Sequence, residues 1–431
     1  MLYRLNEILL NQVLQRDSVT NCAAVIVDKE HVVRFEAGGP YFIQNKGPFY
    51  VGDVWVMAGQ SNMRGHGLYY DPFTNQDLRE PLKHSQLFLF DSSEQWLPFT
   101  YDPSHRLSIS PRTVHHTLPD PTVKDPALLT YRGASLTNGF ANAYQQLHPK
   151  VPLGLIACAH GGTSLYDWRP TVNEPDTSLY GAMIDKIKRS GHHVCGILWY
   201  QGESDATDPS FACHYAHKFK QWLANVRTDL SNPDLPVAMV QIGPHRLDKP
   251  NMIDLWDIVQ DQQRQLFGIT PFTAGAASLD ADLDDRLHIS ARSLTVIGKR
   301  LAYAAEKARL GQGASATPLP SRAYCQSFSF HQLTMMTVVI EFDHLDTPWQ
   351  LALNQQVSGF SLAVNETNEP VGLLKAMIED PQKGSVRLYL ISPTKNDLVI
   401  NYGIHSSSGN LITTDGRALP AFYNFPVNNT Q

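Results

Sequence analysis

The chain has 431 residues and a formal net charge of −6, with 42% hydrophobic and 18% charged residues. That length accommodates two or three domains, and the composition is that of a soluble globular protein able to bury a core. The acidic balance argues against nucleic acid as a partner, and the absence of any apolar run near ~20 residues argues against a membrane partner.

Cysteine usage and the first residues bear on the compartment. The five cysteines lie far apart without a CxxC pair, which argues against a disulfide framework or a zinc ribbon: Cys22, Cys158, Cys195, Cys213 and Cys325. Polar residues interrupt residues 1–17, so this stretch is not a signal-peptide core. The sequence leaves two compartments open: the protein is cytoplasmic, or it is secreted or periplasmic and its leader has been removed. It also leaves the oligomeric state open.

Three zones follow one another along the chain. Residues 1–50 contain short apolar runs and turns, and we expect an N-terminal β segment that packs with a C-terminal β region. Residues 51–312 alternate buried strands with amphipathic helices, which predicts a three-layer α/β/α domain with a mostly parallel sheet. The predicted strands are 54–58, 153–158, 196–200 and 236–242, and the predicted helices are 138–147, 218–230, 251–267 and 290–308.

The pattern changes after residue 310. A stretch rich in small residues and proline at 311–320 predicts a linker. Beyond it, alternating segments recur at roughly ten-residue spacing and predict an antiparallel, β-sandwich-like accessory domain over 321–431. The segments are 334–342, 350–354, 360–364, 385–391 and 398–404.

The first segment with chemical potential is GQSNM at 59–63. It follows a predicted buried strand, and ligands of parallel sheets bind at the carboxyl ends of strands, so Ser61 is placed to act as a nucleophile. A serine after a strand is also a common helix N-cap, and this five-residue segment alone does not decide between the two.

The second segment, 280–290, contains Asp285 and His288 three positions apart. A serine hydroxyl needs an imidazole to take its proton, and the imidazole needs a carboxylate to fix its tautomer. The alternating aspartates also resemble a calcium loop, but Asp285 stands where that loop needs Gly and Ala291 where it needs Glu. The alternative that remains is a solvated acidic loop.

Two further strand ends carry polar turns. After 196–200, Gln201 offers amide hydrogens for an oxyanion hole, and Glu203 is a second carboxylate that could orient His288. After 153–158, Gly162 and its neighbours form a glycine-rich turn. Residues flanking the motifs suit a polar ligand, and we predict substrate contacts from Asn62, Arg64, Gly162, Thr163, Trp168 and Arg169, with His66 and Arg132 nearby.

Taken together and in order, these blocks resemble the SGNH hydrolases, and within them the sialate O-acetylesterase and acetyl xylan esterase group. GQSNM at 59–63 resembles the nucleophile block, and GASLTNGFANAY from Gly133 the second block. WYQGESDA at 199–206 is similar to the third block, with Gln in place of Asn, and DRLH at 285–288 to the final Asp-x-x-His block. This last block continues as His288-Ile289-Ser290, which is closer to the pattern of the xylan esterases than to the His-Pro common in the sialate branch.

The resemblance implies a flavodoxin-like catalytic domain and carbohydrate O-acetylesterase chemistry without a metal or cofactor. It implies Ser61 as nucleophile, His288 as general acid–base, and Asp285 or Glu203 as the orienting carboxylate. The implied oxyanion donors are the backbone N–H groups of Ser61 and Gly133 and the Gln201 side chain. The expected partner is an O-acetylated carbohydrate.

Other interpretations stay open at this point. One keeps the catalytic residues but changes the substrate to an acyl lipid or thioester, which needs an apolar acyl channel. Another is an acetyl xylan esterase. A third is a non-catalytic carbohydrate-binding protein, against which the intact Ser61, His288 and both carboxylates speak.

Overall fold

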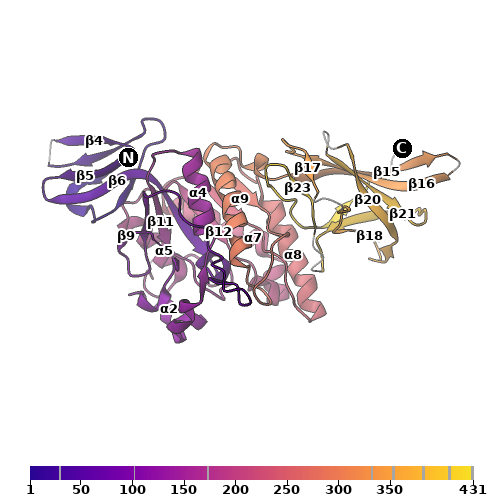
Figure 1. The fold of residues 1–431 in the computed structure, drawn as a ribbon, viewed down its shortest axis with the longest axis horizontal. Helices are drawn as coiled ribbons and strands as arrows, with labels where there is room; N and C mark the ends of the chain where they lie inside the picture. Colours follow the sequence, from indigo (N-terminus) through magenta and orange to yellow (C-terminus); the bar gives the residue numbers. More distant parts are fainter. Residues whose placement is uncertain are drawn as a thin grey trace.

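The computed structural model describes residues 1–28, 31–100, 102–171, 174–331, 333–351, 355–380, 384–405 and 409–428. It is a mixed α/β structure built around one central sheet, with β strands at both ends of the molecule (Figure 1). No helix in these ranges combines the length and apolarity that crossing a bilayer requires.

The central sheet has the strand order β14-β13-β12-β6-β11-β8-β9. Along this order the pairings are parallel except for β8 with β9. Its strands are β6 (Lys46–Gly59), β8 (Leu87–Phe90), β9 (Trp96–Pro98), β11 (Leu153–Ala157), β12 (Gly196–Tyr200), β13 (Val237–Val240) and β14 (Thr273–Ala276). All residues of β11 to β14 are buried, as expected of parallel strands covered on both faces. The four predicted strands coincide with β6, β11, β12 and β13.

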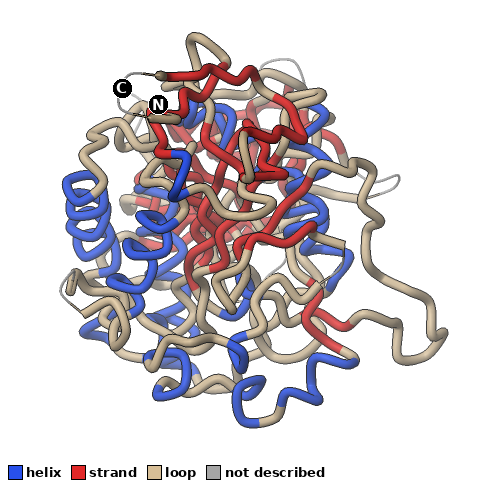
Figure 2. The backbone as a smooth tube through the Cα atoms, turned by 90° about the vertical axis from the view of Figure 1, so that its left-hand side faces the viewer, coloured by secondary structure: helices blue, strands red, loops and turns tan. Residues whose placement is uncertain are grey.

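Helices flank this sheet on both sides (Figure 2). The long ones are α4 (Thr137–Leu147), α5 (Leu179–Arg189), α7 (Tyr215–Asp229), α8 (Pro250–Leu266) and α9 (Ala291–Arg309). Glycines let α4 and α9 approach closely, because a Cβ on Gly139 would lie 2.2 Å from the carbonyl oxygen of Thr295. The four predicted helices are present with ends shifted by at most three residues, whereas α5, β8 and β14 were not predicted. Short helices are α1 (Ser61–Arg64), α2 (Val114–Thr117), α3 (Pro121–Lys124) and α6 (Pro209–Ala212).

The N-terminal strands have a small core of their own. The strands β1 (Leu2–Arg4), β3 (Cys22–Ile26) and β4 (Val32–Glu36) form one sheet, while β2 (Val13–Gln15) and β5 (Gly38–Ile43) pair with β6. This region lies at the end of the molecule opposite the C-terminal strands (Figure 1), so the expectation that 1–50 packs with them is wrong. The reason is β6, whose first half pairs with β2 and β5 and whose second half runs into the central sheet.

The C-terminal region has two four-stranded antiparallel sheets that share one cluster of buried side chains. The first contains β15 (Leu319–Phe330), β16 (Leu333–Asp343), β20 (Leu373–Asp380) and β21 (Ser385–Leu390). The second contains β18 (Phe360–Val364), β19 (Pro370–Val371), β22 (Leu398–Tyr402) and β24 (Phe422–Pro426). A separate pair joins β17 (Trp349–Gln350) to β23 (Ile412–Thr413). The predicted strand at 350–354 begins in β17, and its residues 352–354 lie outside the described ranges.

A buried amide joins the central and C-terminal regions. Gln241, directly after β13, accepts from the N–H of Ala421 at 2.8 Å and donates to its carbonyl at 2.9 Å. Both residues are buried, so these backbone groups have no easy access to water.

We therefore expect Gln241→Ala to lower the free energy of unfolding by about 2 kcal/mol or more, because it leaves buried backbone groups unpaired. Urea unfolding measures this, with Gln221→Ala on the exposed side of α7 as the matched control. Equal effects of the two substitutions would contradict the role of Gln241.

Candidate active site

Ser61 lies at the carboxyl end of the central strand β6, where α1 begins. The turn requires Gly59, which has φ of +131° and whose Cβ would lie 2.1 Å from the carbonyl oxygen of Tyr200. The N–H of Gln60 donates to that same oxygen at 2.8 Å. The chain therefore turns sharply at the sheet edge and leaves Ser61 partly exposed.

His288 belongs to the loop between β14 and α9, and Asp285 organises this loop. Asp285 Oδ1 accepts from the N–H groups of Leu287 and His288 at 3.0 and 2.9 Å. Its Oδ2 lies 2.8 Å from His288 Nδ1. Of the two carboxylates that the sequence left open, Asp285 is thus the one that contacts the imidazole.

Asn62 connects the serine turn to the histidine loop. Its Oδ1 accepts from the N–H of Ile289 at 3.1 Å, and its Nδ2 donates to the carbonyl of Leu287 at 3.3 Å and to Glu203 Oε1 at 2.6 Å. The predicted substrate contact by Asn62 is corrected here, because the side chain is buried and bonded to the protein.

Ser61 and His288 line one pocket of about 260 Å³. Four of the other residues singled out in the sequence also line it: Arg64, His66, Gly162 and Glu203. The remaining lining residues are Gln60, Pro119, Asp120, Pro121, Gly161, Ser204, Thr207 and Leu287.

The two carboxyl groups that the sequence offered as partners of His288 have opposite electrostatic surroundings. Burial raises the pKa of Glu203, although Asn62 donates to one of its oxygens. Partial burial also acts to raise the pKa of Asp285, but the hydrogen bonds from His288 and from the N–H of Leu287 outweigh it and lower that pKa. Asp285 is therefore the ionised carboxylate, the state that accepts a hydrogen bond from the imidazole.

Two of the three predicted oxyanion donors, Gln201 and Gly133, are placed less favourably than the third, the backbone N–H of Ser61. Gln201 is fully buried, and its Nε2 donates to the carbonyl of Thr163 at 2.9 Å and to Asp205 Oδ2 at 2.6 Å. These bonds use both amide hydrogens. Gly133 is not among the residues that line the pocket. It packs against Tyr69 instead, since a Cβ added at Gly133 would lie 2.6 Å from the Tyr69 hydroxyl.

Three predicted substrate contacts are also corrected. Trp168 is fully buried, packs edge-on against Trp199 and donates to Thr163 Oγ1 at 3.1 Å. Thr163 is buried too, so neither side chain can touch a sugar in this arrangement. Arg169 is exposed but lies over the Tyr166 ring, and lines a different surface pocket.

Asp120 was not identified from the sequence, and Gly161 was placed only within the glycine-rich turn, with no role beside the serine. A Cβ on Gly161 would lie 3.6 Å from Ser61 Cβ and 2.3 Å from Asp120 Oδ2, so Gly161 and Asp120 are neighbours of the serine. Asp120 accepts from the N–H of Gly161 at 3.1 Å and pairs with Arg64 Nε at 3.1 Å, and both charged side chains are buried. The one sequence signal is the Pro-Asp-Pro run at 119–121.

His66, Asp285 and His288 have ligand atoms within 4.8 Å of one another, a spacing that would suit a metal ion. However, the ring nitrogens of His66 lie 2.7 Å from Arg64 Nη2 and 2.6 Å from Arg132 Nη1. Two guanidinium groups repel a cation, so this donor set does not fit a metal site.

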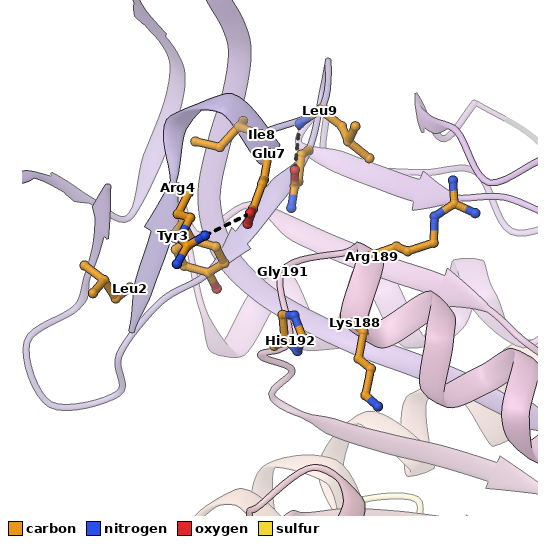
Figure 3. A pocket seen from close by; sticks show the side chains of 11 residues that line it. Leu2, Tyr3, Arg4, Glu7, Ile8, Leu9, Lys188, Arg189, Gly191 and His192 are labelled. Atoms are coloured by element: carbon orange, nitrogen blue, oxygen red, sulfur yellow. Dashed lines mark hydrogen bonds and ion pairs between the residues drawn. The ribbon is translucent and has the colours of Figure 1, made fainter. Parts of the chain in front are cut away.

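A larger pocket, of about 730 Å³, lies between the N-terminal segment and the end of α5 (Figure 3). Arg4 and Glu7 form an exposed ion pair at 3.8 Å on one side of it, and Lys188 and Arg189 lie on the other. None of the residues that line it belongs to the four sequence blocks, so we assign the chemistry to the smaller pocket.

The family model described as "carbohydrate esterase, sialic acid-specific acetylesterase" matches residues 51–307. The chain belongs to this family. It is 26% identical over 263 residues to a probable carbohydrate esterase of Arabidopsis thaliana, covering 58% of this chain and 89% of that protein. Its fold is similar to that of a carbohydrate acetylesterase from Xanthomonas citri, with a TM-score of 0.68, 22% identity, and 96% and 97% of the two chains covered.

Membership in this family supports esterase activity and a carbohydrate substrate. The matched residues include the serine turn, the Gln201 turn and the Asp285–His288 loop. The family match therefore covers the elements that line the smaller pocket.

The Arg64–Asp120 pair generates a prediction about stability. Burial acts to raise the pKa of Asp120, but the Arg64 charge and the Thr122 hydrogen bonds outweigh it and lower that pKa. Asp120→Ala leaves Arg64 buried without this partner, so we expect it to lower the free energy of unfolding by about 3 kcal/mol. A carboxyl with a lowered folded-state pKa stabilises above its ordinary pKa, so the difference should shrink as the pH falls below that range.

Denaturant unfolding at neutral and acidic pH measures this effect. Asp125→Ala is the matched control, because Asp125 caps a turn in the same loop by accepting from the N–H of Ala127 but is exposed. A loss at neutral pH no larger than that of the control would contradict the prediction.

Proposed function

We propose that this protein is a carbohydrate O-acetylesterase that acts through an acetyl-serine intermediate on Ser61. The observation that carries the proposal is the 2.8 Å contact of Asp285 with His288 Nδ1, on a loop that lines the same pocket as Ser61. We take the fold to be the three-layer SGNH arrangement with a sandwich-like accessory domain.

The reaction follows from these positions. Ser61 Oγ attacks the acetyl carbonyl carbon while its proton passes to His288 Nε2. The tetrahedral intermediate then expels the sugar oxygen, which takes the proton from His288 and leaves as an alcohol. A water molecule attacks the acetyl-serine with His288 again as base, and acetate leaves as Ser61 regains its proton.

Asp285 holds the imidazole with Nδ1 protonated and stabilises the imidazolium that forms at each step. The carboxylate is suited to this because its lowered pKa keeps it ionised. The developing oxyanion needs N–H donors, and we assign the backbone N–H of Ser61, which as the first residue of α1 has no intrahelical acceptor. We leave Gly133 out of this assignment, because it lies outside the pocket. The direct role of Gln201 stays a prediction.

The size of the pocket favours a short acyl group. At about 260 Å³ it lies below the range of about 300–1,000 Å³ typical of sites for drug-sized ligands. An acetyl group fits this volume better than a long acyl chain does. The titratable residues Arg64, Asp120 and Glu203 also line the pocket, but their side chains are buried. O-acetylated sialic acid is the first candidate substrate because of the family, and acetylated xylan is the second.

Acetate release from both substrates, and hydrolysis of acetyl and octanoyl p-nitrophenyl esters, test the proposal together. We expect the acetyl ester to be preferred, and Ser61→Ala to lower kcat by a factor on the order of 10⁴ or more, because it removes the nucleophile. Ser210→Ala, an exposed serine that donates to Asp208, is the matched control and should retain activity.

Preference for the octanoyl ester would point to the lipid or thioester interpretation. Unchanged hydrolysis by Ser61→Ala would show that Ser61 is not the nucleophile.

A further inference from the structure

Two arginines and one histidine form a row that links Arg64, which lines the pocket, to the carboxylate of Asp285. Arg64 Nη2 lies 2.7 Å from His66 Nδ1, and Arg132 Nη1 lies 2.6 Å from His66 Nε2. Arg132 Nη1 also lies 3.5 Å from Asp285 Oδ2. The row therefore ends on the oxygen that contacts His288 Nδ1.

His66 is an uncharged spacer in this row. Burial, together with the charges of His288, Arg64 and Arg132, lowers the pKa of His66 to about 2. Its ring packs on that of His288 with centroids 4.0 Å apart and an interplanar angle of 44°. A neutral imidazole has one acceptor nitrogen, so it can accept from one guanidinium at a time while holding the ring of His288 in place.

Four other charged or titratable groups lie near His288, and three of them are engaged elsewhere. Asp284, on the same loop, accepts from the N–H of Leu68 at 2.7 Å. Glu203 is buried with a raised pKa and accepts from Asn62. Arg64 acts through His66 and is paired with Asp120. The remaining group is Arg132.

Arg132 differs from these groups in contacting the Asp285 carboxylate itself. Its side chain is only 18% exposed, so its charge is less screened by solvent than that of a surface arginine. Arg132, Asp285 and His288 are thus linked in a continuous arrangement through one oxygen atom of Asp285.

We propose that Arg132, held by His66, is a positioning residue that acts on His288 through Asp285 and extends the working range of the enzyme to lower pH. The proposal rests on the assignment of His288 as the base. The guanidinium offsets part of the negative charge of Asp285, so the carboxylate favours protonated His288 less strongly. His288 then stays neutral, and able to take the proton of Ser61, at lower pH than it would without Arg132.

The test is the pH profile of kcat/KM for p-nitrophenyl acetate from about pH 4 to about pH 9, whose acid limb reports the essential base of the free enzyme. In Arg132→Gln we expect the acid limb to move to higher pH by about 0.5–1 unit, the effect of removing a partly screened charge a few ångströms away. Below that limb kcat/KM should therefore fall three- to tenfold relative to wild type, when each is scaled to its own plateau.

Two variants control for packing and for charge. Arg132→Lys keeps the charge and should return the limb to the wild-type position, even if its plateau is lower. Arg286→Gln removes a neighbouring arginine that is 69% exposed and pairs with Asp248, and should leave the limb in place. An unmoved limb in Arg132→Gln, or equal shifts in the Gln and Lys variants, would overturn the proposal.

A second measurement separates this proposal from the proposed function. In Ser61→Ala protein, which needs no turnover, the ring-proton NMR titration of His288 should move upward when Arg132→Gln is added. A shift in this titration supports the Arg132 effect even if the protein hydrolyses no acetyl ester. An unmoved titration in an active enzyme refutes the Arg132 effect alone.

Discussion

The side-chain amide of Asn62 is the contact on which the geometry of the site depends. Asn62 follows Ser61 directly after β6, and its side chain bonds the backbone of Leu287 and Ile289 in the loop after β14. It also donates to the carboxylate of Glu203, which follows β12. The amide therefore joins the segments that follow three different strands of the central sheet. The serine and histidine segments lie 227 positions apart, and they meet because strands of a parallel sheet end at one edge. A buried amide with donors and acceptors in fixed directions then sets how the two segments lie.

Unequal burial gives chemically similar groups different tasks. Glu203 and Asp285 are both carboxyl groups near His288, but burial raises the pKa of the first and hydrogen bonds lower that of the second. In the same way Arg64 is fully buried and paired with Asp120, whereas Arg132 is partly exposed and contacts Asp285. The site therefore contains several charges, but only those beside the imidazole bear directly on its proton.

The sequence predicted much of the central region. Apolar runs bounded by turns predicted four of the central strands, and helical periodicity predicted α4, α7, α8 and α9. The Asp-x-x-His spacing placed the carboxylate and the imidazole on one turn, which the structure shows. The predictions about sugar contacts were weaker: Trp168 and Thr163 were chosen because they follow a glycine-rich turn, yet both are buried. Gly161, which belongs to that same glycine-rich turn, does lie beside Ser61, and so does Asp120, which stands in no such motif.

The sequence by itself determined four of the central strands, four of the long helices and which polar residues stand at strand ends, because periodicity and turn chemistry are local properties of the chain. Only the tertiary structure decided that Asp285 rather than Glu203 contacts His288. It also decided that the Gln201 amide donates its hydrogen bonds to acceptors within the protein. It also decided that the N-terminal strands lie away from the C-terminal sheets (Figure 1). These outcomes depend on burial and on contacts between distant segments, which no local pattern encodes.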